Sequence, residues 1–230
     1  MEVVAVLFFI GIAVTAIWWS YHAKKKRREL MARIAEQRGA RYLAKDPWGL
    51  SSVHERRFST LRTGSRRYAY NVVHGDWETK PFWLFDHHYE TYSHDKNGRK
   101  THHHYRTFLL LETNLDLGGL EVRPEGFFDK VKSAFGFDDI DFESAEFSRK
   151  WFVSAEDREF AFQVFHARMI EHFLTLGDLR MATAGPYVLL RVGRNLMNEE
   201  EMNRTFVHAR DFLERLPRFV RKDRALGGER

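Results

Sequence analysis

The sequence lacks cysteine altogether. Disulfide bonds, thiolate metal sites and a cysteine nucleophile are therefore excluded, and the composition fits a reducing compartment. The chain also lacks a glycine-rich phosphate loop, a zinc signature and a serine nucleophile elbow. It contains no internal repeat and no low-complexity tract. These absences leave no catalytic residue to predict, and no catalytic activity is expected.

Charge is missing from residues 3–19, where Thr15 is the one polar side chain. A helix of this length rises roughly 26 Å, close to the ~30 Å of a bilayer core. Trp19 and Tyr21 follow at the level where aromatic rings prefer lipid headgroups. A buried helix of a globular domain is the alternative, but runs this apolar are first interpreted as membrane spans. We therefore predict a transmembrane anchor over residues 1–22, in contact with the bilayer through residues 3–19.

A basic cluster follows the apolar run directly, whereas Glu2 alone among charged residues precedes it. The positive-inside rule then predicts one span in the inner (cytoplasmic) membrane, with the N-terminus outside and the rest of the chain in the cytoplasm. A cleaved signal peptide would need basic residues before the run and small residues after it, so it is disfavoured. We expect the cluster to contact anionic lipid headgroups; its members are Lys24, Lys25, Lys26, Arg27 and Arg28.

The net charge of +5 raises the question of a nucleic-acid partner. The excess is local, because residues 1–45 hold nine Lys or Arg and three Glu, whereas residues 46–230 hold 28 Lys or Arg and 29 Asp or Glu. Attraction to anionic lipid explains a basic segment beside a membrane without nucleic acid. We therefore expect no nucleic-acid partner.

Three further segments are predicted after the anchor. Residues 23–45 form a basic juxtamembrane helix, which is a stalk, a lipid-surface helix or the first helix of the domain. Residues 46–216 form one cytoplasmic α+β domain, long enough to bury a core. The basic tail over residues 217–230 is expected to be disordered.

An antiparallel sheet packed against two or three helices is the predicted architecture of the domain. Alternating and doubly apolar runs between turn residues predict four strands, over residues 58–63, 66–74, 81–92 and 101–112. Asn97-Gly98 between the last two is the strongest short hairpin signal. Downstream, the pattern predicts a short strand within 115–125, a helix over 126–135 and a strand over 148–153. A helix from the N-cap Ser154 to about Leu174, a hairpin over 178–192 turning at Gly185-Pro186, and a last helix capped by Asn198 are predicted to follow.

Six histidines lie on this predicted hairpin: His87, His88, His94, His102, His103 and His104. If Asn97-Gly98 is a two-residue turn, His94 faces Thr101. One face of the hairpin then carries His88, Glu90, His94 and His103, and the other His87, His102 and His104. Imidazole and carboxylate are ligands for a divalent metal such as zinc. His94, His103 and Glu90 are therefore the candidate ligands, and a solvated polar hairpin tip is the alternative.

A further group of residues carries a resemblance to a known family. These are Leu120-Glu121-Val122-Arg123-Pro124-Glu125, Phe137-Asp138-Asp139-Ile140-Asp141-Phe142-Glu143, Glu146-Phe147-Ser148 and Tyr70-Asn71-Val72-Val73-His74-Gly75. Together with the basic segment after a single span, they resemble uncharacterised bacterial single-span membrane proteins, the family of unknown function 3137. The resemblance implies no activity, cofactor or catalytic residue.

Two functions follow as expectations from the sequence. The first is a non-enzymatic interaction or scaffold module at the inner face of a bacterial membrane, with a protein partner that the sequence does not identify. The alternative is a membrane-tethered enzyme that uses a divalent metal bound by the histidine-rich hairpin.

Overall fold

The computed structural model describes residues 2–96, 98–126 and 140–227, without the side chains of residues 2–10, 12, 13 and 16. It has an α+β fold built on an antiparallel sheet, as the sequence predicts. The sheet has eight strands in the order β1-β2-β3-β4-β8-β7-β5-β6. The strands are β1 (Arg41–Lys45), β2 (Ser65–Trp77), β3 (Lys80–Asp95), β4 (Gly98–Glu112), β5 (Leu120–Pro124), β6 (Trp151–Ala155), β7 (Leu179–Ala184) and β8 (Tyr187–Val192).

Helices cover both faces of this sheet, and they outnumber the predicted two or three. They are α1 (Glu2–Gln37), α2 (Leu50–His54), α3 (Ser59–Arg62), α4 (Ala145–Lys150), α5 (Arg158–Val164), α6 (Ala167–Thr175), α7 (Glu199–Arg215) and α8 (Arg218–Asp223). On one face, Met31 and Ile34 from the end of α1 join Phe206 of α7 in the larger core. On the other face, the short helices α2 and α3 cover a smaller core.

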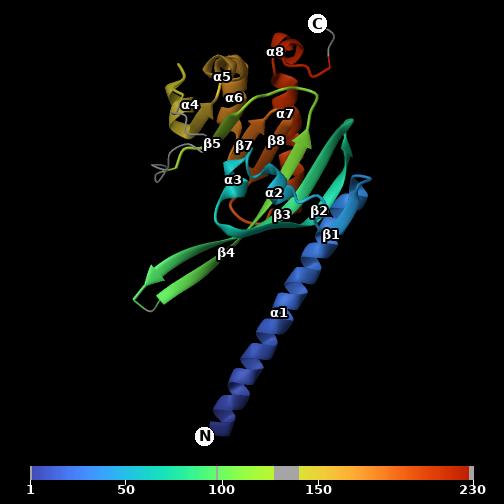
Figure 1. The fold of residues 1–230 in the computed structure, drawn as a ribbon, viewed down its shortest axis with the longest axis vertical. Coiled ribbons are helices and arrows are strands. Elements are labelled where there is room, and N and C mark those ends of the chain that lie inside the picture. Colours follow the sequence, from blue (N-terminus) through green and yellow to red (C-terminus); the bar gives the residue numbers. More distant parts are fainter. Residues whose placement is uncertain (1, 97, 127–139, 228–230) are drawn as a thin grey trace.

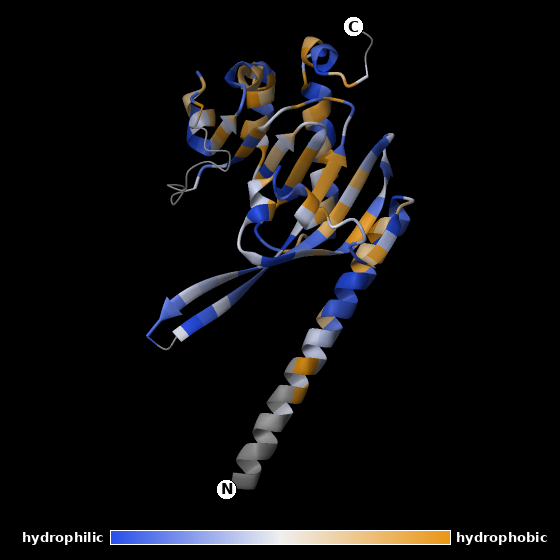
Figure 2. Ribbon diagram, viewed as in Figure 1, coloured by the Kyte–Doolittle hydropathy of each residue, from blue (hydrophilic) through white to orange (hydrophobic). Residues whose placement is uncertain are grey.

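Two elements extend beyond the domain, and both project from the same side of it (Figure 1). One is the N-terminal part of α1, and the other is the far half of the β3–β4 hairpin. Figure 2 shows hydrophilic residues along the middle of α1 and at the end of the hairpin. Because the last turns of α1 belong to the core, the projecting part of the helix continues a structured part of the domain.

Within the residues that the structure describes, no helix has the length and apolar character needed to cross a bilayer. The transmembrane anchor predicted for residues 1–22 is therefore not confirmed.

The basic helix predicted for residues 23–45 ends earlier than expected. Gly39 adopts a positive φ of 60°, a conformation that glycine accepts without strain and that commonly terminates helices. The chain then forms β1, where Leu43 pairs with Val72. Leu30, Ile34 and Leu43 follow one another at a helical spacing in the sequence, but Leu43 lies in this strand.

Other boundaries also differ from the prediction. The strand predicted over residues 58–63 is instead α3. The strand predicted over 148–153 is found as β6, shifted towards the C-terminus and preceded by α4, and the helix predicted from Ser154 is divided into α5 and α6. The tail is not disordered throughout, because α8 forms and buries Val220 against the core. The helix predicted over residues 126–135 lies mostly outside the described residues.

The C-terminal part of the domain follows the prediction closely. Strands β7 and β8 form the hairpin that turns at Gly185-Pro186, with Ala184 paired to Tyr187. Asn198 caps α7 through a capping box with Glu201, in which each side chain accepts a hydrogen bond from the other residue's backbone N–H. This is the expected chemistry of a helix start.

Candidate functional site

The β3–β4 hairpin has a register that differs by two residues from the predicted one. Asp95 pairs with Gly98, so His94 faces Arg99 and not Thr101. Gly98, with a φ of 107°, opens β4 and does not occupy the second position of the turn. A shift by two residues keeps every side chain on its predicted face. It changes the neighbours, however, and places Glu90 directly opposite His103.

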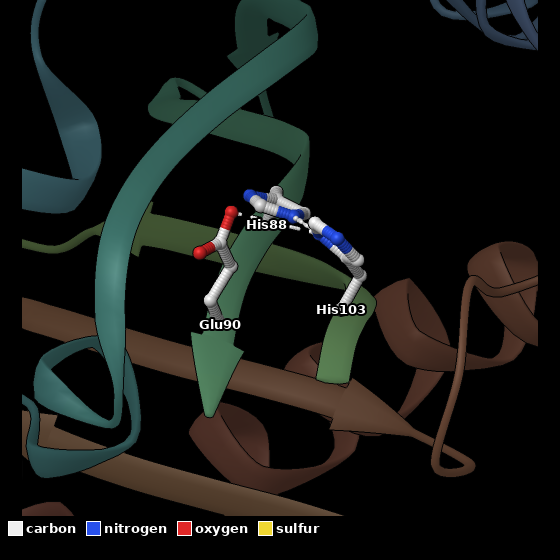
Figure 3. A group of neighbouring side chains, drawn as sticks. All are labelled: His88, Glu90 and His103. Carbon is white, nitrogen blue, oxygen red and sulfur yellow. Dashed lines mark hydrogen bonds and ion pairs between the residues drawn. The ribbon is translucent and has the colours of Figure 1, made fainter. Parts of the chain in front are cut away.

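These two residues meet His88 in a compact group on one face of the hairpin (Figure 3). His88 Nε2 and His103 Nδ1 are 3.1 Å apart, and His103 Nδ1 lies 3.6 Å from Glu90 Oε1. One nitrogen or oxygen from each of the three residues falls within 4.8 Å of the others. His88 and Glu90 are buried and His103 is exposed, so the group lies at the boundary between the buried part of the domain and its surface.

The predicted ligand His94 is not part of this group. It lies at the exposed end of the hairpin opposite Arg99. His102 and His104 contact Ser93 and Thr91 on the other face, each at 2.8 Å. Of the predicted set of three, the structure therefore brings together Glu90 and His103, and His88 takes the third place.

Strand β2 determines how His88 and Glu90 are held. The register between β2 and β3 shifts between Ser65 and Tyr68, and Arg66 adopts a positive φ of 48°. This irregularity presents the Arg66 carbonyl to His88 Nδ1 at 3.3 Å. Nearby, Gly64 approaches the backbone of Glu90 so closely that a Cβ at this position would lie 2.4 Å from the Glu90 carbonyl oxygen. Bulges of this kind are common beside functional sites, where they redirect a side chain.

The hydrogen bonds indicate a single arrangement of protons when the rings are neutral. A carbonyl oxygen can only accept, so His88 Nδ1–H donates to Arg66 and leaves Nε2 as an acceptor for His103 Nδ1–H. Tyr92 donates its hydroxyl hydrogen to Glu90 Oε2 at 2.8 Å. This bond lowers the pKa of Glu90, and burial lowers the pKa of His88. Both shifts favour the protonation states that bind a metal, namely carboxylate and neutral imidazole.

The spacing of these atoms fits a metal ion. Zinc bonds of about 2.0–2.2 Å at the tetrahedral angle place two ligand atoms roughly 3.3 Å apart. The two distances from His103 Nδ1, 3.1 and 3.6 Å, bracket this value. The carbonyl partner of His88 and the hydroxyl partner of Glu90 are the outer contacts that orient metal ligands. Three protein ligands would leave a fourth position for water or substrate, as in catalytic zinc sites.

Arg66 is a competitor for this carboxylate. Its Nη1 lies 3.7 Å from Glu90 Oε1, and its side chain is largely exposed. An exposed ion pair of this length contributes little free energy. The arginine can therefore move away when a cation of higher charge binds Glu90.

Arg27 belongs to a second polar group, at the centre of the sheet. Its Nε and Nη2 donate to the two carboxylate oxygens of Asp86 at 2.9 and 2.5 Å, and its Nη1 donates to the Met197 carbonyl at 2.6 Å. Asp86 is fully buried and also accepts hydrogen bonds from Thr107 and Asn71. The prediction that Arg27 contacts lipid is therefore wrong, because its guanidinium is held inside the domain.

Asn71 reaches this group through a second irregularity in β2. The register shifts between Tyr70 and Val73, and Asn71 adopts a positive φ of 49°. Asparagine tolerates this conformation better than most residues. The other four cations of the basic cluster are exposed, and their contact with lipid stays a prediction.

The sequence carries a signal for each of the two groups. Asp86 is a carboxylate directly after the apolar run Phe82–Phe85, a position that a buried strand tolerates only when the charge is paired. His88 and Glu90 are two residues apart, which places them on one face of a strand. Choosing between His88 and His94 required the register, which no local signal determines.

The chain matches no known protein family and no curated protein sequence. The resemblance to the family of unknown function 3137 therefore stays a prediction. Among solved structures, the crystal structure of the mycobacterial trehalose monomycolate transport factor A, TtfA, has a similar fold with a TM-score of 0.60 and 15% sequence identity. The match covers 83% of this chain and 96% of the TtfA chain. At this identity the similarity establishes the fold alone.

Proposed function

We propose that this chain is a membrane-anchored protein whose α+β domain acts as a non-enzymatic interaction module at the cytoplasmic face of a bacterial inner membrane. The observation that carries the proposal is α1, a single unbroken helix from Glu2 to Gln37. Its C-terminal turns are part of the domain core, while its N-terminal part projects from the domain (Figure 1).

The side chains along the projecting helix support an anchor there. Ile17 and Trp19 are 70% and 73% exposed, which is costly for large apolar groups in water. They belong to the charge-free run over residues 3–19 and are followed by the basic cluster. In a bilayer, the apolar side chains would be solvated by lipid and the aromatic rings would lie at the headgroup level.

The bidentate pair between Arg27 and Asp86 supports a fixed rather than a flexible attachment. It joins α1 to the middle of β3 from within the basic cluster. The domain would therefore keep one orientation relative to the membrane. The hairpin end, with the exposed cations Lys96, Arg99 and Lys100, would face the same membrane as the helix.

The similarity to TtfA bears on the choice between binding and catalysis. The TtfA structure is described as that of a transport factor. Fold similarity does not transfer function. As part of the proposal, we suggest that this domain also has a role in transport at the membrane. It would do so by binding a protein partner and not by catalysing a reaction.

Protease accessibility tests the orientation that this function requires. In membrane vesicles sealed with the cytoplasmic face outward, added protease should degrade the domain, and in vesicles of the opposite orientation the domain should be protected. Detergent should abolish the protection. Degradation in the opposite orientation with intact vesicles would contradict a cytoplasmic domain.

A second candidate function rests on the group formed by His88, Glu90 and His103. The distances between their ligand atoms favour a divalent metal at this site. The full chain, purified without a metal-affinity tag, should then contain about one equivalent of zinc. His103→Ala should lose it, whereas His102→Ala, on the opposite face of the hairpin, should retain it.

The metal measurement separates the two candidates. If no metal remains after zinc is added and the protein is dialysed, the group does not bind metal. The hydrogen bond between the two imidazoles would then stabilise the hairpin only. Equal metal content in both variants would place the ion elsewhere in the chain.

A further inference from the structure

Three arginines from three neighbouring strands lie side by side on the face of the sheet that α2 and α3 partly cover. Arg180 of β7 pairs directly with Arg191 of β8. Val122 of β5 pairs with Met181, which places Arg123 next to Arg180 in the same row. Like charges directly opposite one another in a sheet are destabilising. A row of three therefore requires a compensating interaction.

All three arginines line one cavity of about 50 Å³. Its apolar lining includes Phe58 and Phe108, while Ser59 and Thr60 of α3 contribute hydroxyl groups. A water molecule requires roughly 10–15 Å³ measured in this way, so the space admits about three to five waters or one group of that size. A tetrahedral oxyanion has this size.

Arg191 carries a charge that forms no ion pair with a carboxylate of the described residues. The residue is 4% exposed, and its one hydrogen bond goes from Nη1 to the Gly193 carbonyl. Among the described residues, no carboxylate oxygen lies within 4.0 Å of its guanidinium. Burial lowers the pKa of Arg191 to about 9, so the group still carries its proton at neutral pH. A buried, uncompensated cation is costly, and protein interiors normally pair it.

Of the two neighbouring arginines, Arg180 is only partly compensated within the part of the chain that the structure describes. Arg180 Nη2 lies 3.6 Å from Asp178 Oδ1, beyond hydrogen-bond distance, and its Nε is buried without a hydrogen-bond partner. Arg123 lies 3.6 Å from Glu121 and stacks over the ring of Phe152 at 4.0 Å. Among the described residues that line the cavity, Glu121 is the one acid, against three arginines.

We propose that this cavity binds the phosphate group of a small soluble molecule, with Arg180 and Arg191 as its main ligands and Arg123 beside them. Guanidinium groups present paired N–H donors that match the oxygens of phosphate. A divalent anion would neutralise the excess charge of the row and supply acceptors for the N–H groups that lack them. The cavity has room for a phosphate group alone, so the rest of the molecule would lie outside it.

Calorimetric titration of the full chain in detergent with inorganic phosphate tests this site, at constant ionic strength maintained with chloride. The parent should bind phosphate saturably at one site. Arg180→Gln and Arg191→Gln should each weaken binding by about tenfold or more, since each removes charge-assisted hydrogen bonds. Arg62→Gln changes an exposed arginine that does not line the cavity, and it should bind as the parent does.

Melting curves identify any variant that fails to fold. Arg180 is the more exposed of the two main ligands, so its variant keeps the test valid if Arg191→Gln is unstable. The proposal is overturned if the parent shows no saturable phosphate binding beyond chloride. It is also overturned if folded Arg180→Gln binds phosphate with the affinity of the parent. In that case the arginines would contact water in the cavity, and phosphate would bind elsewhere.

Discussion

At the scale of single residues, buried polar groups determine how this molecule is held together. Arg27 and Asp86 form a bidentate pair inside the domain, and Thr107 and Asn71 donate the remaining hydrogen bonds to the carboxylate. Thr107 Oγ1 also accepts a hydrogen bond from Arg27 Nη2. Such a pair adds little net stability compared with an apolar replacement of both partners. Removing one partner is different, because it leaves a buried charge without compensation.

We therefore expect Arg27→Met to lower the free energy of unfolding by about 3–5 kcal/mol. Lys25→Met is the matched control in the same cluster, since Lys25 is exposed and pairs weakly with Glu29 at 3.9 Å. Its effect should stay within about 0.5 kcal/mol. Urea unfolding of both variants in detergent measures the difference. Equal effects of the two substitutions would show that the buried pair does not hold the helix.

His87 should make the protein sensitive to acid. The ring is fully buried, neither nitrogen has a hydrogen-bond partner among the described residues, and burial lowers the pKa of the ring to about 4. In the unfolded chain the ring titrates near ~6.5, so between these values the unfolded state binds a proton that the folded state does not. The contribution is complete above pH ~6.5 and is lost as the pH falls towards ~4, which amounts to roughly 3 kcal/mol.

His87→Leu removes this titration and should flatten the loss of stability between these pH values. His94→Leu, at the exposed end of the hairpin, should keep the steeper pH dependence of the parent. Urea unfolding across the acid range compares the three proteins. An identical pH dependence of the His87 variant and the parent would contradict a neutral buried ring.

At the scale of elements, the sequence predicts those with strong local signals and fails where several short elements follow one another. The start of α7 was predictable because Asn198 and Glu201 form a capping box. Ser154 has the same type of side chain followed by acids, but the cap is Asp157, which accepts a hydrogen bond from Phe160 N–H at 3.0 Å. The strand β6 is buried at all five positions, so no alternation marks its bounds, and the prediction began it three residues too early.

Asn198→Ala should lower the free energy of unfolding by about 1 kcal/mol, because the amide N–H of Glu201 loses its acceptor at the start of the helix. Asn203→Ala serves as the control within the same helix, since Asn203 is exposed and takes no part in the cap. Thermal unfolding of both variants provides the comparison. A larger loss for Asn203→Ala than for Asn198→Ala would exclude the cap as the determinant of this helix start.

At the scale of the whole molecule, the sequence predicts the fold class and the position of the long helix. It does not predict the order of the strands, because β5 is followed by β6 in the chain yet also pairs with β7. Pairing across such distances depends on the whole core and leaves no local signal. The candidate metal ligands were partly predicted for the same reason. The alternation of side chains along the strands places Glu90 and His103 on one face, whereas the choice of His88 as the third ligand depends on the register between the strands.

The central claim is that α1 carries the domain at a membrane, and flotation with lipid vesicles tests it most directly. The full chain is reconstituted by detergent removal with phosphatidylcholine and phosphatidylglycerol, and then separated in a density gradient at high salt. Each lysine placed in the middle of a spanning helix costs about 2.5–3.5 kcal/mol. The variants are Gly11→Lys with Val14→Lys, and Val53→Lys as a control at an exposed valine of α2.

The account predicts that the parent and Val53→Lys float with the vesicles at high salt, while the double lysine variant remains at the bottom of the gradient. Flotation of the double variant to the same extent as the parent would contradict an apolar anchor in α1. Release of the parent by salt would contradict it as well, because the basic cluster alone would then hold the protein at the lipid surface.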